Sequence, residues 1–255
     1  MTATKYLLEI CASSHRSAHN AQEAGAHRVE LCQNLEQGGI TPSYGLVKHC
    51  VQTLNIPIHV LIRPRPGNFV YNDDEFEIML NDINMCHDLG VAGVVVGALN
   101  QDHTVDIVKT KKMVETAQSL HVTFHRAIED CADQVQALED VVEAGCQRIL
   151  TSGLGNTATE KLDNLCKLIE QAEGRVEIMP GGGVTSRNIQ QILAQTGAKS
   201  VHASAKSRRS RTDTMQQSKF DVEEMESSTS LIEELVDKLK DILCRMEYEP
   251  ADTEC

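Results

Sequence analysis

The sequence predicts an α/β protein that folds as a (β/α)₈ barrel of the TIM type, a single domain with a divergent helical tail. Eight short aliphatic segments alternate with longer segments of helical character, at roughly 28 residues per unit. Several helical segments end in glycine just before the next aliphatic segment. The length of 255 residues suits one barrel, which needs about 250. A doubly wound open sheet uses the same strand–helix units and stays open as the alternative, although the regular spacing favours the barrel.

The eight aliphatic segments are predicted to be parallel strands. Each is short and aliphatic, as is typical of strands whose outer face is covered by helices. Aromatic residues make up only 3% of the chain, with no Trp, so aliphatic side chains must fill the core. The predicted strands span residues 6–12, 28–32, 57–63, 93–99, 121–126, 148–152, 175–180 and 200–205.

The segments between these strands are predicted to be helices. They span residues 14–24, 44–54, 74–89, 105–119, 132–144, 159–173 and 186–196. Four of them are followed by a glycine, which takes the left-handed C-cap conformation without Cβ strain. These glycines are Gly25, Gly90, Gly145 and Gly197. Thr157 and Glu160 have the spacing of a capping box, so we expect them to begin the helix predicted at 159–173.

The last part of the chain has a different character. Residues 206–211 form a short basic run, a polar stretch follows to residue 229, and residues 231–246 are amphipathic with a helical period. We therefore predict a barrel domain at 1–211 and, at 212–255, a polar segment and an amphipathic helix that packs on the barrel or extends it. A scaffold that binds partners through this helix is the alternative. Its apolar face consists of Leu231, Leu235, Leu239, Ile242 and Leu243.

The charge balance argues against several classes of partner. Lys and Arg number 24 against 37 for Asp and Glu, a formal net charge of −13, whereas nucleic acids and anionic membranes need a basic face. The start of the sequence lacks the apolar stretch of a signal peptide, and no apolar run approaches the roughly 18 residues of a membrane helix. We expect a cytoplasmic protein without nucleic-acid or membrane partners. The basic run at 206–211 resembles a nuclear-localisation signal and leaves a nuclear location open as well.

Cysteines at two strand ends are candidate metal ligands. The nine cysteines include no CxxC pair, so zinc ribbons and thioredoxin-like chemistry have no support. The first two strands end alike, with Glu9 and Cys11 on one and Glu30 and Cys32 on the next. Side chains two apart on a strand point to the same side, and neighbouring strands lie about 4.8 Å apart. Two thiols at the same height could then bind one Cu(I), which prefers thiolate ligands. The alternative is that both cysteines merely fill space in the core.

Charged residues at other strand ends extend this candidate site. Two buried carboxylates, Glu9 and Glu30, need cationic partners or a function, because an unpaired buried charge is costly. Arg63 ends the predicted third strand and could bind a carboxylate or an anion. His125 ends the fifth and could act as a general acid or base. If the protein is an enzyme, these four residues are its candidate catalytic groups; structural salt bridges are the alternative.

A glycine turn after the predicted seventh strand is a candidate anion site. Gly181, Gly182 and Gly183 let bare amides approach a ligand, and a helix begins just after them. Barrels of this type often hold phosphate at the loops that follow strands seven and eight. Ser204 and Lys206, at the end of the eighth strand, could complete such a site. A glycine turn that only relieves crowding is the other interpretation.

Seven short motifs follow one another between residues 6 and 211: EIC at 9–11, RVELC at 28–32, GGITPS at 38–43, IRPR at 62–65, TFHRA at 123–127, LTSG at 150–153 and MPGGG at 179–183. In this order and at these intervals they resemble the CutC copper-homeostasis family. The resemblance implies a (β/α)₈-type barrel, a cytoplasmic homo-oligomer (a dimer or a tetramer) and a link to cellular copper. It also implies Cu(I) binding by Cys11 and Cys32.

The sequence departs from the family pattern at a few positions. The fifth motif continues as Ile128-Glu129 where the family usually has Phe-Asp, and Ala203 stands where some animal members have cysteine. The leading hypothesis is a copper homeostasis protein that binds Cu(I) for intracellular buffering or handling. The alternative is an enzyme that acts on a small anionic or phosphorylated metabolite at the C-terminal mouth of the barrel.

Overall fold

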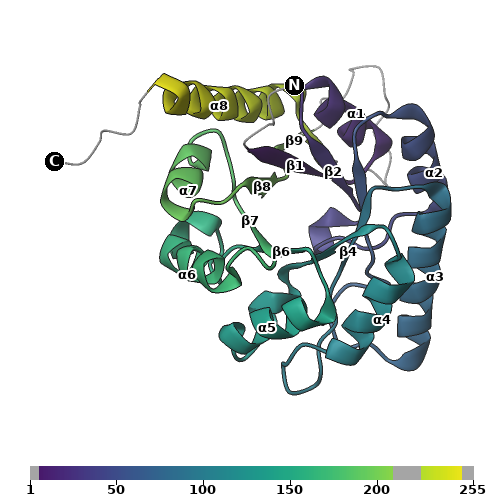
Figure 1. The fold of residues 1–255 in the computed structure, drawn as a ribbon. Helices are drawn as coiled ribbons and strands as arrows, with labels where there is room; N and C mark the ends of the chain where they lie inside the picture. Colours follow the sequence, from purple (N-terminus) through teal and green to yellow (C-terminus); the bar gives the residue numbers. More distant parts are fainter. Residues whose placement is uncertain (1–5, 209–224, 249–255) are drawn as a thin grey trace.

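The computed structural model describes residues 6–208 and 225–248. Eight parallel strands form one sheet in the order β7-β6-β5-β4-β3-β2-β1-β8, and a bridge between Gly181 and His202 brings its two edges together. The sheet is therefore a nearly closed barrel, as predicted, and helices surround it (Figure 1). The strands are β1 (Leu7–Ala12), β2 (Arg28–Leu31), β3 (Ile58–Leu61), β4 (Gly93–Val96), β5 (His121–Phe124), β6 (Arg148–Thr151), β7 (Glu177–Pro180) and β8 (Ser200–Ala203).

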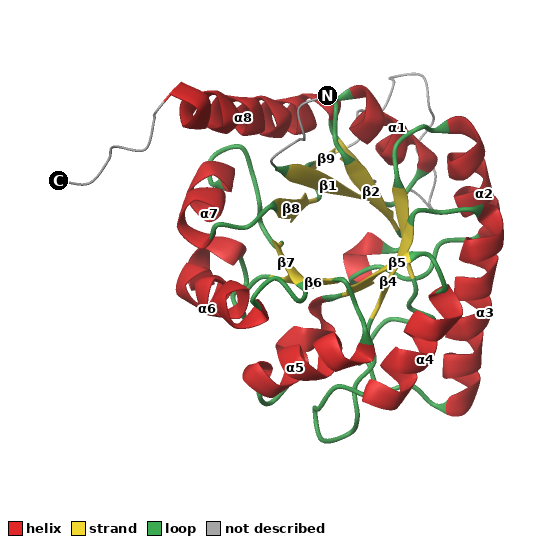
Figure 2. Cartoon of the chain, in the orientation of Figure 1, coloured by secondary structure: helices red, strands yellow, loops and turns green. Residues whose placement is uncertain are grey.

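Helices alternate with the strands around the barrel, as Figure 2 shows. Gly90, Gly145 and Gly197 are left-handed C-caps, and Gly25 has a positive φ just after α1, so the predicted glycine ends are confirmed. Within the described ranges, no helix is both long and apolar enough to cross a bilayer. The α-helices are α1 (His15–Glu23), α2 (Tyr44–Thr53), α3 (Asp73–Leu89), α4 (Ile107–Ala117), α5 (Gln134–Ala144), α6 (Leu162–Ala172), α7 (Ile189–Thr196) and α8 (Thr229–Tyr248), with short 3₁₀ helices η1 (Leu35–Gln37), η2 (Arg126–Asp130) and η3 (Ala158–Lys161).

The capping box predicted at Thr157 and Glu160 is wrong. Thr157 precedes the 3₁₀ helix η3, and its side chain caps no backbone amide. Its hydroxyl instead donates to the Glu160 carboxylate, whose other oxygen accepts from the amide of Asn156. Both oxygens of the Glu160 carboxylate are therefore engaged, and neither accepts from the backbone amide of Thr157 as a capping box requires. Helix α6 begins at Leu162, after η3. A complete capping box occurs at α3, between Asn72 and Glu75.

The inside and the outside of the barrel have opposite character. On β1, Leu8 and Ile10 point outwards, are fully buried and join the main hydrophobic core beneath the helices. Glu9, between them, points inwards, where it pairs with Arg28. The aliphatic residues expected from the composition therefore fill the layer between sheet and helices. Much of the barrel interior is polar and charged. Its buried polar side chains include Glu9, Arg28, Glu30, His59, Thr123, Arg148 and Ser200.

The C-terminal part returns to the barrel. Helix α8 packs against α1 and α7, and Figure 1 shows it beside both in the outer ring. Leu235 and Leu239 are buried, as the predicted apolar face requires, and Ile242 and Leu243 pack against the core, but Leu231 is exposed. A short hairpin of β9 (Lys206–Arg208) and β10 (Met225–Ser227) was not predicted. The proposed domain boundary at residue 211 lies outside the described residues and stays a prediction.

Shortening Ile232, which is fully buried where α8 contacts the core, tests this docking. We expect Ile232→Val to lower the free energy of unfolding by about 1 kcal/mol, because one buried methyl group is lost. Urea unfolding followed by far-UV circular dichroism measures the change. The matched control is Val108→Ala on α4, where the side chain is 80% exposed and the expected change is within about 0.5 kcal/mol. Equal effects of the two variants would contradict the docked position of α8.

Candidate functional site

The candidate site lies at the C-terminal mouth of the barrel, where side chains from several strand ends face one cavity. The cavity has a volume of about 640 Å³. Cys11 from β1, Glu30 from β2, His202 from β8 and the loop residues Arg63 and His125 all line it. Catalytic and binding groups of TIM barrels are found at this end, because the βα loops there vary without disturbing the barrel.

A pair of buried thiols lies at one wall of the mouth, which Cys11 lines. The sulfur atoms of Cys11 and Cys32 are 3.7 Å apart, and both cysteines are free thiols. The strand register pairs Cys11 with Glu30, so Cys32 lies two residues beyond the partner of Cys11 on β2. Their sulfur atoms meet across this offset. Leu61 and Val95 pack around the pair and keep water away.

The Cys11 thiol is held in its protonated form. The hydrogen bond to the Cys32 sulfur and burial raise its pKa well above the ordinary value, and the nearby Glu30 carboxylate adds to this. A thiolate is needed to bind a metal ion. A cation that binds here must therefore displace a proton from Cys11, as is usual for thiolate metal sites.

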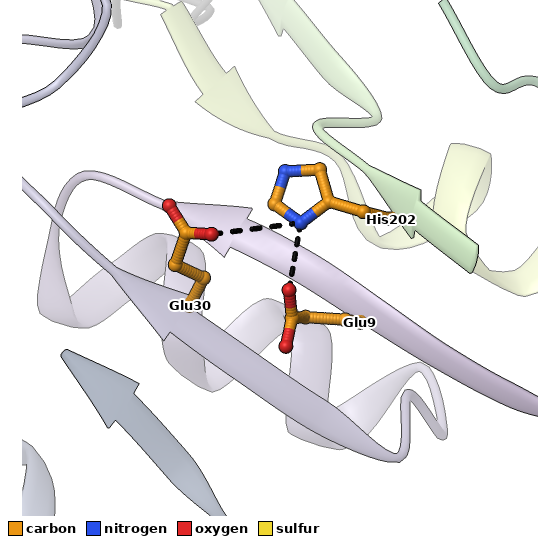
Figure 3. Close-up of side chains that lie close together, drawn as sticks. All are labelled: Glu9, Glu30 and His202. Carbon is orange, nitrogen blue, oxygen red and sulfur yellow. Dashed lines mark hydrogen bonds and ion pairs between the residues drawn. The ribbon is translucent and has the colours of Figure 1, made fainter. Parts of the chain in front are cut away.

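Next to the thiols lies a cluster of two carboxylates and an imidazole (Figure 3). The register of β1 places Glu9 between Arg28 on β2 and His202 on β8. His202 Nδ1 donates to Glu9 Oε1 at 2.8 Å and lies 3.7 Å from Glu30 Oε2. Arg28 binds the other oxygen of Glu9. Glu30 Oε2 is buried and has no hydrogen-bond partner in the described part of the chain.

The charges in this cluster depend on one another. Burial opposes ionisation of Glu9, but the His202 hydrogen bond and the charge of Arg28 outweigh it and lower the pKa of Glu9. Burial is the main cause that raises the pKa of Glu30 to about 7. Burial also opposes the charged form of His202, yet Glu30, Cys11 and Glu9 together raise its pKa well above 6.5. The His202 imidazolium thus occupies the place of a cation between two carboxylates.

Arg63, the arginine predicted to bind an anion, already donates hydrogen bonds to the protein backbone. The Nη atoms of Arg63 donate to the carbonyl oxygens of Gln37, Gly39 and Gly67, and the guanidinium lies over the Phe69 ring. Only its buried Nε lacks a partner among the described residues. Arg63 therefore ties two loops of the mouth together, and its predicted role toward an anion rests on that one N–H group.

His125, unlike Arg63, is uncharged and has a buried ring nitrogen without a partner in the described residues. Its Nδ1 accepts a hydrogen bond from the amide of Ala127, so the proton of the neutral ring is on Nε2. This Nε2 is buried and has no partner within the described ranges. Burial and the nearby charge of Arg63 lower the pKa of His125 to about 3, so the ring is neutral. His125 is thus a neutral hydrogen-bond donor at the wall of the cavity, whereas its predicted role as an acid or base stays untested.

The glycine turn divides into two parts. The amide of Gly181 donates to Thr151 within the barrel, so it is not free for a ligand. Gly182 and Gly183 line the cavity, together with Ser204 and Lys206. Four of the five residues predicted to bind an anion therefore line one cavity, and Gly181 does not.

Sequence reasoning missed three residues that shape the mouth. Arg28 and His202 hold Glu9, and nothing local in the sequence marks either as part of a site. Glu129, at a departure from the family pattern, accepts from the Ser152 amide and pairs with Arg126. The exchange of a family aspartate for glutamate was visible in the sequence and was the one signal that could have pointed to Glu129.

Fold and site together define a TIM-barrel protein whose mouth carries a buried thiol pair beside a carboxylate–imidazole cluster. The model of the CutC family matches residues 6–207, and the chain belongs to this family. The family protein CutC of Xylella fastidiosa is 48% identical over 200 residues, which cover 78% of this chain and 75% of that protein. The family protein CutC of Vibrio cholerae is 44% identical over 207 residues, with 80% and 82% covered.

Solved structures agree with this assignment. A CutC protein of Streptococcus agalactiae, described provisionally as a copper homeostasis protein, superposes with a TM-score of 0.75 at 38% identity. The match covers 78% of this chain and 98% of that one. A structure described provisionally as a deoxyribose-phosphate aldolase from Coccidioides immitis superposes with a TM-score of 0.60 at 13% identity, which is a likeness of fold alone.

Proposed function

We propose that the protein binds Cu(I) between Cys11 and Cys32 and so buffers or hands on copper inside the cell. The observation that carries the proposal is the 3.7 Å separation of the two sulfur atoms. Two free thiols at this distance can both contact one small cation without a change of backbone. Thiolate sulfur is the ligand that Cu(I) prefers in proteins, and a reducing cytoplasm would keep both thiols available.

The surroundings of the thiol pair support binding rather than turnover. Both cysteines are almost completely buried, and Leu61 and Val95 pack against them. A soft cation gains from such a dry site, which leaves no open position for an activated water. The copper homeostasis assigned to the Streptococcus agalactiae relative agrees with this role. The proposed setting is a cytoplasmic homo-oligomer.

Titration with Cu(I) under anaerobic, reducing conditions tests the proposal. We expect the wild-type protein to bind one Cu(I) per chain. The double variant Cys11→Ser, Cys32→Ser should lose at least about 100-fold in affinity, equivalent to about 2.7 kcal/mol. Competition with a chromophoric Cu(I) chelator measures both values.

The chain offers a matched control for this titration. Cys166 is only partly buried and Cys244 is exposed, so the double variant Cys166→Ser, Cys244→Ser removes two thiols far less buried than the proposed pair. It should keep the wild-type affinity. If the two double variants bind Cu(I) equally well, the proposed site is wrong.

A further inference from the structure

The mouth is much larger than a copper site requires. Its volume of about 640 Å³ lies within the roughly 300–1,000 Å³ that is usual for small-molecule sites. The thiol pair and Glu30 occupy only the side formed by β1 and β2. Other walls include the loops after β5, β7 and β8, and these carry hydrogen-bond donors that the copper proposal does not use.

One of these donors is His125, after β5. It lines the cavity and is only 5% exposed, and its buried Nε2–H has no acceptor in the described ranges. A buried donor without a partner is unfavourable, so its presence points to an acceptor that the described residues do not supply. Gly97 leaves the room for this ring, since a Cβ there would lie 2.3 Å from His125 Cε1.

A second group of donors lies at the ends of β7 and β8. Gly182, Gly183 and Val184 line the cavity, and their backbone amides donate no hydrogen bond to any described residue. Ser204 and Lys206 line the same wall, and the Lys206 ammonium forms no ion pair within the described part of the chain. Successive free amides beside a lysine form a concave site for an anion with several oxygen atoms.

The two groups of donors are separated around the mouth. Strand β6 lies between β5 and β7, so His125 and the Gly182 turn face the cavity from different sides. A single small ion therefore cannot satisfy both groups. A molecule that carries an anionic group at one end and an oxygen acceptor at the other can.

The acidic residues of the mouth leave the wall at β7 and β8 free for an anion. The Glu129 carboxylate is neutralised by Arg126 and also accepts from Ser152 and Thr151. Glu30 belongs to the His202 cluster on the side of β1 and β2. Asp130 lies at the end of η2, which follows β5.

We propose that the mouth binds a small phosphorylated metabolite, with its phosphate at the amides of Gly182, Gly183 and Val184 and at Lys206, and with a carbonyl or hydroxyl oxygen at His125. Ser204 would donate a further hydrogen bond to the phosphate. The proposal is independent of copper, because none of these residues is among the thiol pair. It identifies the substrate class that a reaction at this mouth would use.

Calorimetric titration of the metal-free, reduced full chain tests the proposal with three probes: ribose 5-phosphate, inorganic phosphate and ribose. We expect ribose 5-phosphate to bind, inorganic phosphate to bind more weakly and ribose not to bind. Lys206→Ala should weaken binding of both phosphates about tenfold, since one charge-assisted contact of about 1.5 kcal/mol is lost. His125→Phe should weaken ribose 5-phosphate alone.

Control variants separate these effects from loss of fold. Lys199 is exposed and precedes β8 at the opposite end of the barrel, so Lys199→Ala should bind every probe as the wild type does. Ser204→Ala removes a smaller contact and should reproduce the Lys206→Ala effect in part, and circular dichroism checks the fold of each variant. Equal losses in Lys199→Ala and Lys206→Ala, or no phosphate binding by the wild type at millimolar concentration, would overturn the proposal. Because the protein is metal-free, neither result bears on copper binding.

Discussion

Arg28→Met is expected to lower the free energy of unfolding by about 3 kcal/mol at pH 7. Glu9 is fully buried, and Arg28 binds one of its carboxylate oxygens inside the barrel. Removing one partner of a buried ion pair leaves an uncompensated charge, which costs about 3–5 kcal/mol. We expect the lower end of this range, because His202 still donates to the other oxygen of Glu9. Urea unfolding followed by circular dichroism measures the loss.

Two further variants isolate the cause of this loss. In Glu9→Gln, Arg28→Met the buried charge is gone, so part of the lost stability should return. Arg175→Met breaks a surface pair with Glu139, in which both side chains are about 40% exposed, and should cost no more than about 1 kcal/mol. If Arg28→Met costs as little as Arg175→Met, the barrel interior does not depend on this ion pair.

The repeated part of this fold could be predicted from the sequence. Eight aliphatic segments with glycine ends identify eight strand–helix units, because each unit is built from local signals. Side chains two apart on a strand point to the same side, so the sequence also predicts that Glu9 shares a face with Cys11 and that Glu30 shares a face with Cys32. These inferences need no knowledge of how distant segments meet.

The charge network could not be predicted in this way. His202 contacts Glu9 although 193 residues separate them, and this contact exists only because β8 closes the barrel on β1. The register of β1 and β2 pairs Cys11 with Glu30, and the distance between the two thiols likewise depends on how these strands pair. The contacts of Arg63 could not be predicted for a related reason, since the loop carbonyl oxygens that bind it are placed by tertiary structure.

Acid should destabilise the protein through its buried neutral histidines. Burial lowers the pKa of His59 and of His125 to about 3 in the folded chain, whereas an unfolded histidine titrates near 6.5. Between these values the unfolded chain binds more protons, so the stabilisation is complete above about pH 6.5 and is lost as the pH falls toward 3. At pH 5 each histidine should cost about 2 kcal/mol relative to pH 7.5, or about 4 kcal/mol for both.

The measurement must separate this loss from the opposite effect of Glu30. The pKa of Glu30 is raised to about 7, so the folded chain holds its proton more tightly, and this group alone makes stability fall as the pH rises from about 4.5 to 7. Comparison between variants removes the Glu30 contribution, because it is common to all of them. The drop in unfolding free energy between pH 7.5 and pH 5 should be about 2 kcal/mol smaller in His125→Phe than in the wild type. An equal drop in both proteins would mean that folding does not lower the pKa of His125.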